Sequence, residues 1–199
     1  MPKPRRTQRE RRETTRARLL AATQAALVER GTAGATTTEI CRRAGVSQGA
    51  LFKHFASKGE LLAASAEQLF DGLIDAYRDE MPNLAGVEDR ATAAVQLLWG
   101  VFEDPRLLAA IELYGAARTD RELAQRLAPV ADRHGENLRA LSHELFPDAA
   151  ARRPEFDALV AVVVQAMQGA TLGSLASGDR RAFAPMLALL TDLVRKLVG

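Results

Sequence analysis

The sequence predicts an all-α fold in which a short N-terminal group of helices is joined to a longer helical body. Apolar residues recur at helical spacing through most of the 199 residues, and Ser, Thr or Asp stands at the start of several of these runs. No segment shows the strict alternation of apolar and polar residues that is typical of a strand. Aromatic residues make up only 5% of the chain, so Leu, Ala and Val must fill the core.

Composition excludes several classes of protein. A single cysteine, Cys41, cannot form an intramolecular disulfide or a cysteine-built zinc site, and three scattered histidines predict no metal and no cofactor. The longest apolar run, residues 158–164, is far shorter than the roughly 20 residues that span a bilayer. We therefore expect a cytoplasmic protein with no membrane partner.

Positive charge is concentrated at the N-terminal end. The first 60 residues hold 13 Lys and Arg against 5 Glu, a net charge of +8, and the rest of the chain is net −6, which gives the total of +2. Such segregation most often serves to neutralise phosphates, and a solvated basic tail is the plainer alternative.

Three regions follow along the chain. Residues 1–12 form an Arg-rich arm with too little apolar content to fold alone, residues 13–60 form a small helical domain, and residues 61–199 form a second one. Thr14 or Thr15 can cap the first helix, which Gly31 and Gly34 end.

Two capping boxes mark further helix starts. Thr36 with Glu39 opens a short helix that Gly45 stops, and Ser57 with Glu60 opens a long one. Between them, Ser47 can cap a helix reaching residue 55.

The rest of the chain is also predicted to be helical. One is predicted around residues 95–102, one from Pro105 behind an Asp104 cap, and one from Asp120 or Thr119 to about residue 147. Two strongly apolar helices follow, at about residues 154–176 and 180–198.

Residues 37–55 satisfy the physical requirements of a helix-turn-helix. Ile40 and Ala44 give one small apolar face, Gly45 permits a positive φ at the turn, and Leu51 and Phe55 pack into the angle. If so, the second helix lies in a major groove, where Gln48, Lys53 and Ala50 would reach base edges. The flanking polar residues would bind phosphates, which sets register without reading sequence. These are Thr37, Thr38, Ser47, His54 and Lys58.

The stretch from residue 16 to residue 62 resembles the N-terminal domain of the TetR family of bacterial repressors. The matching segments are Gly31, residues 36–40, 44–49, 51–55 and 57–62, in order and spacing. The resemblance places Gly49 and Phe52 at the interface as well. The family usually has Tyr where this chain has Phe52, so a hydroxyl contact to phosphate is expected to be missing.

The resemblance implies a homodimer held by the last two helices, a palindromic double-stranded operator and a small-molecule effector bound in the C-terminal domain. An apolar face on both final helices suits a four-helix interface, although it could instead complete a monomer core. Polar or aromatic residues among apolar ones are the candidates for effector binding, although most residues of this kind belong to ordinary cores. They are Trp99, Phe102, Tyr114, Gln125, His143, Gln165 and Gln168.

The predicted function is therefore a sequence-specific DNA-binding regulator, a repressor that the effector releases. A helical enzyme is the first alternative, but no phosphate loop, nucleophile elbow or metal-ligand spacing supports it. An activator or a non-specific architectural DNA binder is the second.

Overall fold

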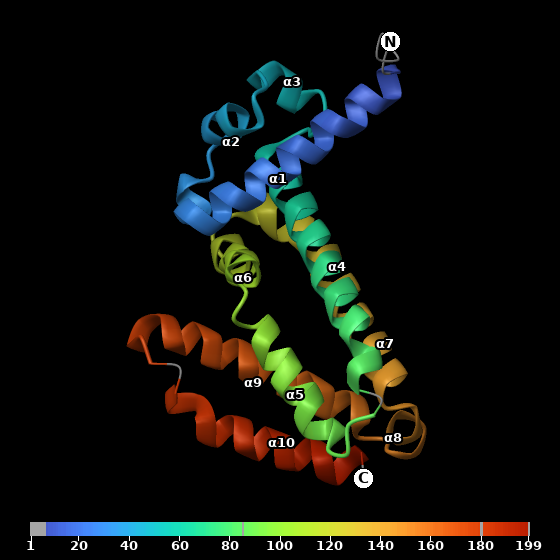
Figure 1. Cartoon of the computed structure of the whole chain (residues 1–199). Helices are drawn as coiled ribbons and strands as arrows, with labels where there is room; N and C mark the ends of the chain where they lie inside the picture. Colours follow the sequence, from blue (N-terminus) through green and yellow to red (C-terminus); the bar gives the residue numbers. More distant parts are fainter. Residues whose placement is uncertain (1–6, 85, 180, 199) are drawn as a thin grey trace. The chain divides into compact units, whose positions relative to one another are not determined.

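The computed structural model describes residues 7–84, 86–179 and 181–198, and within them it is helical with no strand (Figure 1). The chain divides into two compact units, Met1–Leu69 with Ala109–Ala131, and Phe70–Leu108 with Asp132–Gly199. The all-α prediction is confirmed. The predicted boundary after residue 60 falls inside the first unit, which continues to Leu69 and also includes residues 109–131.

Helix α1 (Gln8–Gly34) begins earlier than predicted. The Thr7 hydroxyl accepts from the Glu10 N–H and the Glu10 carboxylate accepts from the Thr7 N–H, a complete capping box. Thr14 is therefore inside the helix, where its hydroxyl donates to the carbonyl of Glu10. The expectation that the arm does not fold alone is wrong for residues 8–12, which belong to α1, and residues 1–6 lie outside the described part of the chain. Gly31, with φ 63°, breaks the helix as expected.

The next three helices also form where capping residues and glycine predict them. They are α2 (Thr37–Ala44), α3 (Gln48–Phe52) and α4 (Lys58–Leu84). Helix α3 is shorter than predicted, since residues 53 and 54 form a turn. Helix α4 ends at Leu84, and Pro82 lies in its last turn, where the missing N–H removes few backbone hydrogen bonds.

The first unit has one apolar centre on which these helices converge. Leu19 of α1, Ile40 of α2, Leu51 of α3, Phe55 and Leu61 of α4 are all almost fully buried. Residues from α6 (Pro105–Ala117) and α7 (Arg121–Leu145) complete the unit. Asp104 and Asp120 accept from backbone N–H groups at the starts of these two helices, as predicted.

The second unit contains α5 (Arg90–Val101), α8 (Pro147–Arg152), α9 (Phe156–Ser177), a 3-10 turn (Arg181–Phe183) and α10 (Ala184–Val198), together with parts of α4, α6 and α7. Helix α8 was not predicted, because six residues are too few to show a period and Phe146 provides no side-chain cap.

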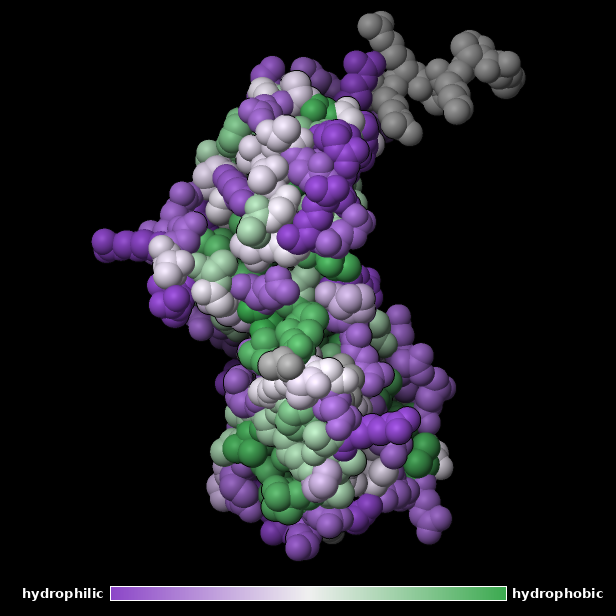
Figure 2. All heavy atoms as spheres, turned by 90° about the vertical axis from the view of Figure 1, so that its left-hand side faces the viewer, coloured by the Kyte–Doolittle hydropathy of each residue, from purple (hydrophilic) through white to green (hydrophobic). Residues whose placement is uncertain are grey.

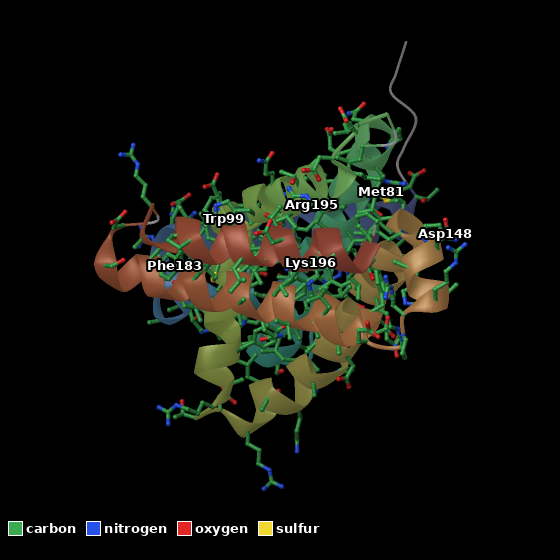
Figure 3. The ribbon with its side chains drawn as sticks, turned by 90° about the horizontal axis from the view of Figure 1, so that it is seen from below. Met81, Trp99, Asp148, Phe183, Arg195 and Lys196 are labelled. Carbon is green, nitrogen blue, oxygen red and sulfur yellow. The ribbon has the colours of Figure 1, made fainter. Side chains whose placement is uncertain are left out.

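Helix α10 packs against α5 and α9, and Figure 3 shows α9 and α10 side by side. Arg195 of α10 binds the carboxylate of Asp89 at 2.7 Å and the hydroxyl of Thr92 at 2.8 Å. These bonds fix the end of α10 to the start of α5 and lower the pKa of Asp89. Buried Ile74, Tyr77 and Leu141 belong to the core cluster of this unit.

Residues 156–175 of α9 are long and apolar enough to cross a membrane by length and composition, which the core helix of a soluble protein also satisfies. Only 28% of that window is buried within the chain.

Candidate nucleic-acid interface

Helices α2 and α3 form a helix-turn-helix whose turn depends on Gly45. Gly45 has φ 63° and ψ 42°, a left-handed conformation that side chains disfavour, and an added Cβ would lie 2.7 Å from the Arg18 guanidinium. Val46 then donates to the carbonyl of Cys41, and the Ser47 hydroxyl accepts from the Ala50 N–H at the start of α3. The turn therefore fixes the direction in which α3 leaves α2. Figure 1 shows both helices on one side of α1.

One face of α3 is left open to solvent. Gln48, Gly49, Phe52 and Lys53 are exposed, whereas Leu51 is fully buried. The spacing of these four residues places them on a single helical face. Of the other predicted contacts, Thr38 and Ser47 are also exposed. Those that are partly buried are Thr37, Ala50, His54 and Lys58.

The side chain of Gln48 is already oriented in the free protein. Its Nε2 donates to the Thr38 hydroxyl at 3.0 Å, which links the first turn of α3 to the first turn of α2. One N–H of the amide and the Oε1 acceptor remain for a ligand, and this is the pair of groups that matches the N7 and N6 of adenine.

Part of the N-terminal positive charge is used inside the unit. The Glu39 carboxylate accepts from Arg42 at 2.8 Å and from Arg43 at 2.6 Å, and Arg43 also binds Glu29 of α1 at 2.7 Å. These bonds lower the pKa of Glu39 to about 2. The predicted capping box is thus only half formed: Thr36 accepts from the Glu39 N–H, but the Glu39 side chain holds arginines instead.

The remaining positive charge lies on α1 and around the end of α3. Arg16 lies over the ring of Phe55, 5.1 Å from its centroid, and Lys53 is exposed. Burial, with the nearby charges of Arg12 and Arg16, lowers the pKa of His54, so its ring is neutral near pH 7 in the free protein. Burial also raises the pKa of the Cys41 thiol, which fits a structural residue rather than a nucleophile.

The start of α4 is tied to α7 within the same unit. The Ser57 hydroxyl accepts from the Glu60 N–H at 3.1 Å and donates to the carboxylate of Glu122 at 2.5 Å. The Glu60 carboxylate accepts from the Ala56 N–H at 2.6 Å, so the reciprocal bond of the predicted capping box is made one residue earlier. Lys58 is the first residue of the helix.

Comparison with known proteins identifies this arrangement. The family model of bacterial regulatory proteins of the tetR family matches residues 19–65. An uncharacterized HTH-type transcriptional regulator of Mycobacterium tuberculosis is 30% identical over 167 residues, which cover 84% of this chain and 86% of that protein. The chain belongs to the TetR family. This TetR-family protein is thus a DNA-binding transcriptional regulator.

Other TetR-like proteins match over nearly the whole length. The HTH-type transcriptional regulator CymR of Pseudomonas putida is 26% identical over 92% of this chain and 90% of its own. The crystal structure of the multidrug binding protein EbrR complexed with ethidium matches with a TM-score of 0.64 and 26% identity, covering 88% of this chain and 97% of that one.

The effector candidates of this TetR-family chain are spread over both units. Tyr114 and Gln125 belong to the first unit, and the other five belong to the second. Phe102 is buried, Trp99 and Gln168 are partly buried, and Gln125 is exposed. Figure 3 shows Trp99, on α5, beside α10. His143 is exposed, and its Nε2 lies 2.6 Å from the Asp157 carboxylate.

A groove of about 270 Å³ runs between α7 and α9 in the second unit. Of the seven candidates, Gln165 lines it, beside Leu138, Val160 and Val164, and charged Arg139 and Asp157 complete its wall. No group of three metal-ligating side chains occurs among the described residues.

His134 is a polar residue of this unit that was not among the predicted site residues. Its ring stacks on Phe70 with centroids 4.1 Å apart, and its Nδ1 is buried without a hydrogen-bond partner in the described structure. Burial lowers its pKa to about 4, against the opposing charge of Asp71. Its burial could have been predicted from the sequence, because His134 lies at helical spacing in the apolar stripe of Val130, Leu138 and Leu141.

Proposed function

We propose that this regulator is a homodimeric repressor that occupies a palindromic operator in the cytoplasm and leaves it when a small hydrophobic effector binds. The observation that carries the proposal is the open face of α3, where the Gln48 amide is oriented by its bond to Thr38 and both Gln48 and Lys53 are exposed to solvent. Two such faces, one from each subunit, would enter successive major grooves about 34 Å apart.

Dimerisation is supported by the apolar side chains exposed on the last two helices. Val162 and Leu175 of α9 are 53% and 55% exposed, and Leu189 of α10 is 60% exposed. Hydrophobic residues gather over the ends of these helices in Figure 2. Apolar side chains exposed in this way are unfavourable in water and favour association, and two helices from each subunit would make a four-helix interface.

Release by an effector is supported by how the DNA-reading helices are attached. Helix α4 begins beside α3, is capped by Ser57 and contributes residues to both units. A small pivot of α4 would change the spacing of the two α3 helices without altering a base contact. Effector and DNA then weaken each other by the same factor.

The test is selection of genomic fragments by the purified, ligand-free protein at physiological salt, followed by sequencing. We expect an inverted repeat near a promoter, and loss of its selective binding in Gln48→Ala. Gln96→Ala, an exposed glutamine of α5, is the matched control. Enrichment without a motif, unaffected by Gln48→Ala and steeply dependent on salt, would support the architectural alternative instead.

Repression and release require two further measurements. Transcription from the selected promoter should fall when the protein is added and recover with the effector. A panel of hydrophobic compounds, including the ethidium that the similar EbrR binds, is screened by thermal shift without DNA. Unchanged operator affinity with a compound shown to bind would contradict the release mechanism.

A further inference from the structure

Phe52 is an exposed aromatic residue on the face of α3 that is otherwise polar or small. It is the last residue of the helix and is 49% exposed, whereas Leu51 beside it is fully buried. The other large hydrophobic residues exposed in the described chain are Val and Leu side chains outside α3. Packing in the core of this unit therefore does not explain why an aromatic residue occupies position 52.

The neighbours of Phe52 define what its ring can approach. Gln48 stands one helical turn earlier on the same face, about 6 Å along the axis. Between them Gly49 leaves the backbone bare, since a Cβ there would meet only the Ser47 hydroxyl, at 3.9 Å. The face thus presents a fixed amide, an open patch of backbone and an apolar ring.

We propose that Phe52 is a specificity-determining residue that packs on the C5-methyl group of a thymine, about two base pairs from the base that Gln48 reads. The inference rests on the proposed function, because it requires α3 to lie in a major groove. Among the edges of the bases there, the thymine methyl is the apolar group. A phenyl ring has no hydroxyl with which to bind phosphate, so burial against a methyl is the favourable contact that the groove offers it.

The test replaces each thymine of the selected operator in turn by deoxyuridine, which removes the methyl group alone. Wild-type protein should lose about fourfold in affinity at one symmetric position, the value of one buried methyl-sized group. Phe52→Ala should bind the unmodified operator more weakly and show no further loss at that position. Phe52→Tyr keeps the ring and should keep the sensitivity to the methyl group.

Two controls make the result specific. Gln48→Ala should retain the loss at the deoxyuridine position, because its contact is to another base. Exchanging that T·A pair for C·G should weaken binding, and 5-methylcytosine in the exchanged pair should recover part of the loss. Since Phe52 is half exposed, thermal unfolding of its variants should match that of the wild type.

The contact is refuted if no deoxyuridine changes wild-type affinity, or if the loss is equal in Phe52→Ala. A ring that packs on deoxyribose would give the first result together with weakened binding by Phe52→Ala. If no operator is selected at all, the proposed function itself fails, and this outcome is distinct from an operator that binds without sensitivity to a thymine methyl.

Discussion

Two surfaces of this protein are left uncovered within the chain, and they differ in chemistry. The face of α3 presents an amide, a bare glycine, a lysine and one ring, and its helix start is already capped by Ser47. The faces of α9 and α10 present Val and Leu side chains. The first suits a hydrated, hydrogen-bonding partner, and the second suits another apolar surface. The two surfaces can therefore bind different kinds of partner, because one offers hydrogen-bonding groups and the other offers apolar side chains.

The apolar surface should be the more sensitive to a charge. Leu189→Arg puts a guanidinium into each half of the proposed interface, and we expect dimer association to weaken by roughly 100-fold or more, about 3 kcal/mol. Sedimentation velocity over a concentration series measures it. Gln96→Arg, at an exposed position of α5, is the control. If the dimer association of Leu189→Arg were unchanged, the interface would not include Leu189.

A substitution in the polar surface should reduce the specificity of DNA binding and leave dimer assembly unchanged. Gln48→Ala removes one base-reading side chain from each subunit and should reduce operator affinity by about 1 to 3 kcal/mol per half-site. The slope of affinity against salt should not change, whereas Lys58→Ala should lower that slope. Fluorescence anisotropy at several salt concentrations distinguishes the two. Equal loss on unrelated DNA would mean that Gln48 reads no base.

Stability should depend on pH through His134 of the second unit. The folded pKa of about 4 lies below the ordinary histidine value of 6.5, so the unfolded chain binds the proton more tightly. Stability is full above about pH 6.5 and falls by the order of 2 kcal/mol as pH drops towards 4, after allowance for partial exposure. Urea unfolding of His134→Leu should lack this dependence, while exposed His143→Gln should keep it. A wild-type slope in His134→Leu would contradict the assignment.

The smallest effect concerns the turn that aims the polar face. Gly45→Ala puts a Cβ at positive φ and against Arg18, and should destabilise the protein by about 1 to 2 kcal/mol. Gly72→Ala is the matched control: this exposed glycine within α4 has open space around it, so alanine should stabilise by roughly 0.5 to 1 kcal/mol. Urea unfolding measures both changes in stability. If Gly45→Ala stabilised the protein as Gly72→Ala does, the turn would not require a glycine at position 45.

Local sequence signals predicted the helix starts best where a side chain bonds its own helix. Asp104, Asp120, Ser47 and Gly45 act within a few residues of their position, so the sequence alone locates them. The same reasoning failed at Thr14, because the reciprocal cap of Thr7 and Glu10 starts the helix about two turns earlier. It also failed at Glu39, whose carboxylate is held by arginines of α2.

The sequence by itself determined the all-helical class and the helix-turn-helix, because helical period, capping and a glycine turn are local properties. Tertiary structure alone decided that Glu29 joins Arg43, that Glu122 holds Ser57 and that residues 109–131 pack with the N-terminal helices. Those partners are 14 or more residues apart along the chain, and no local period records them. Tertiary structure also decided the burial of His134 and the exposure of Phe52, since both depend on which helix faces are covered when the chain packs.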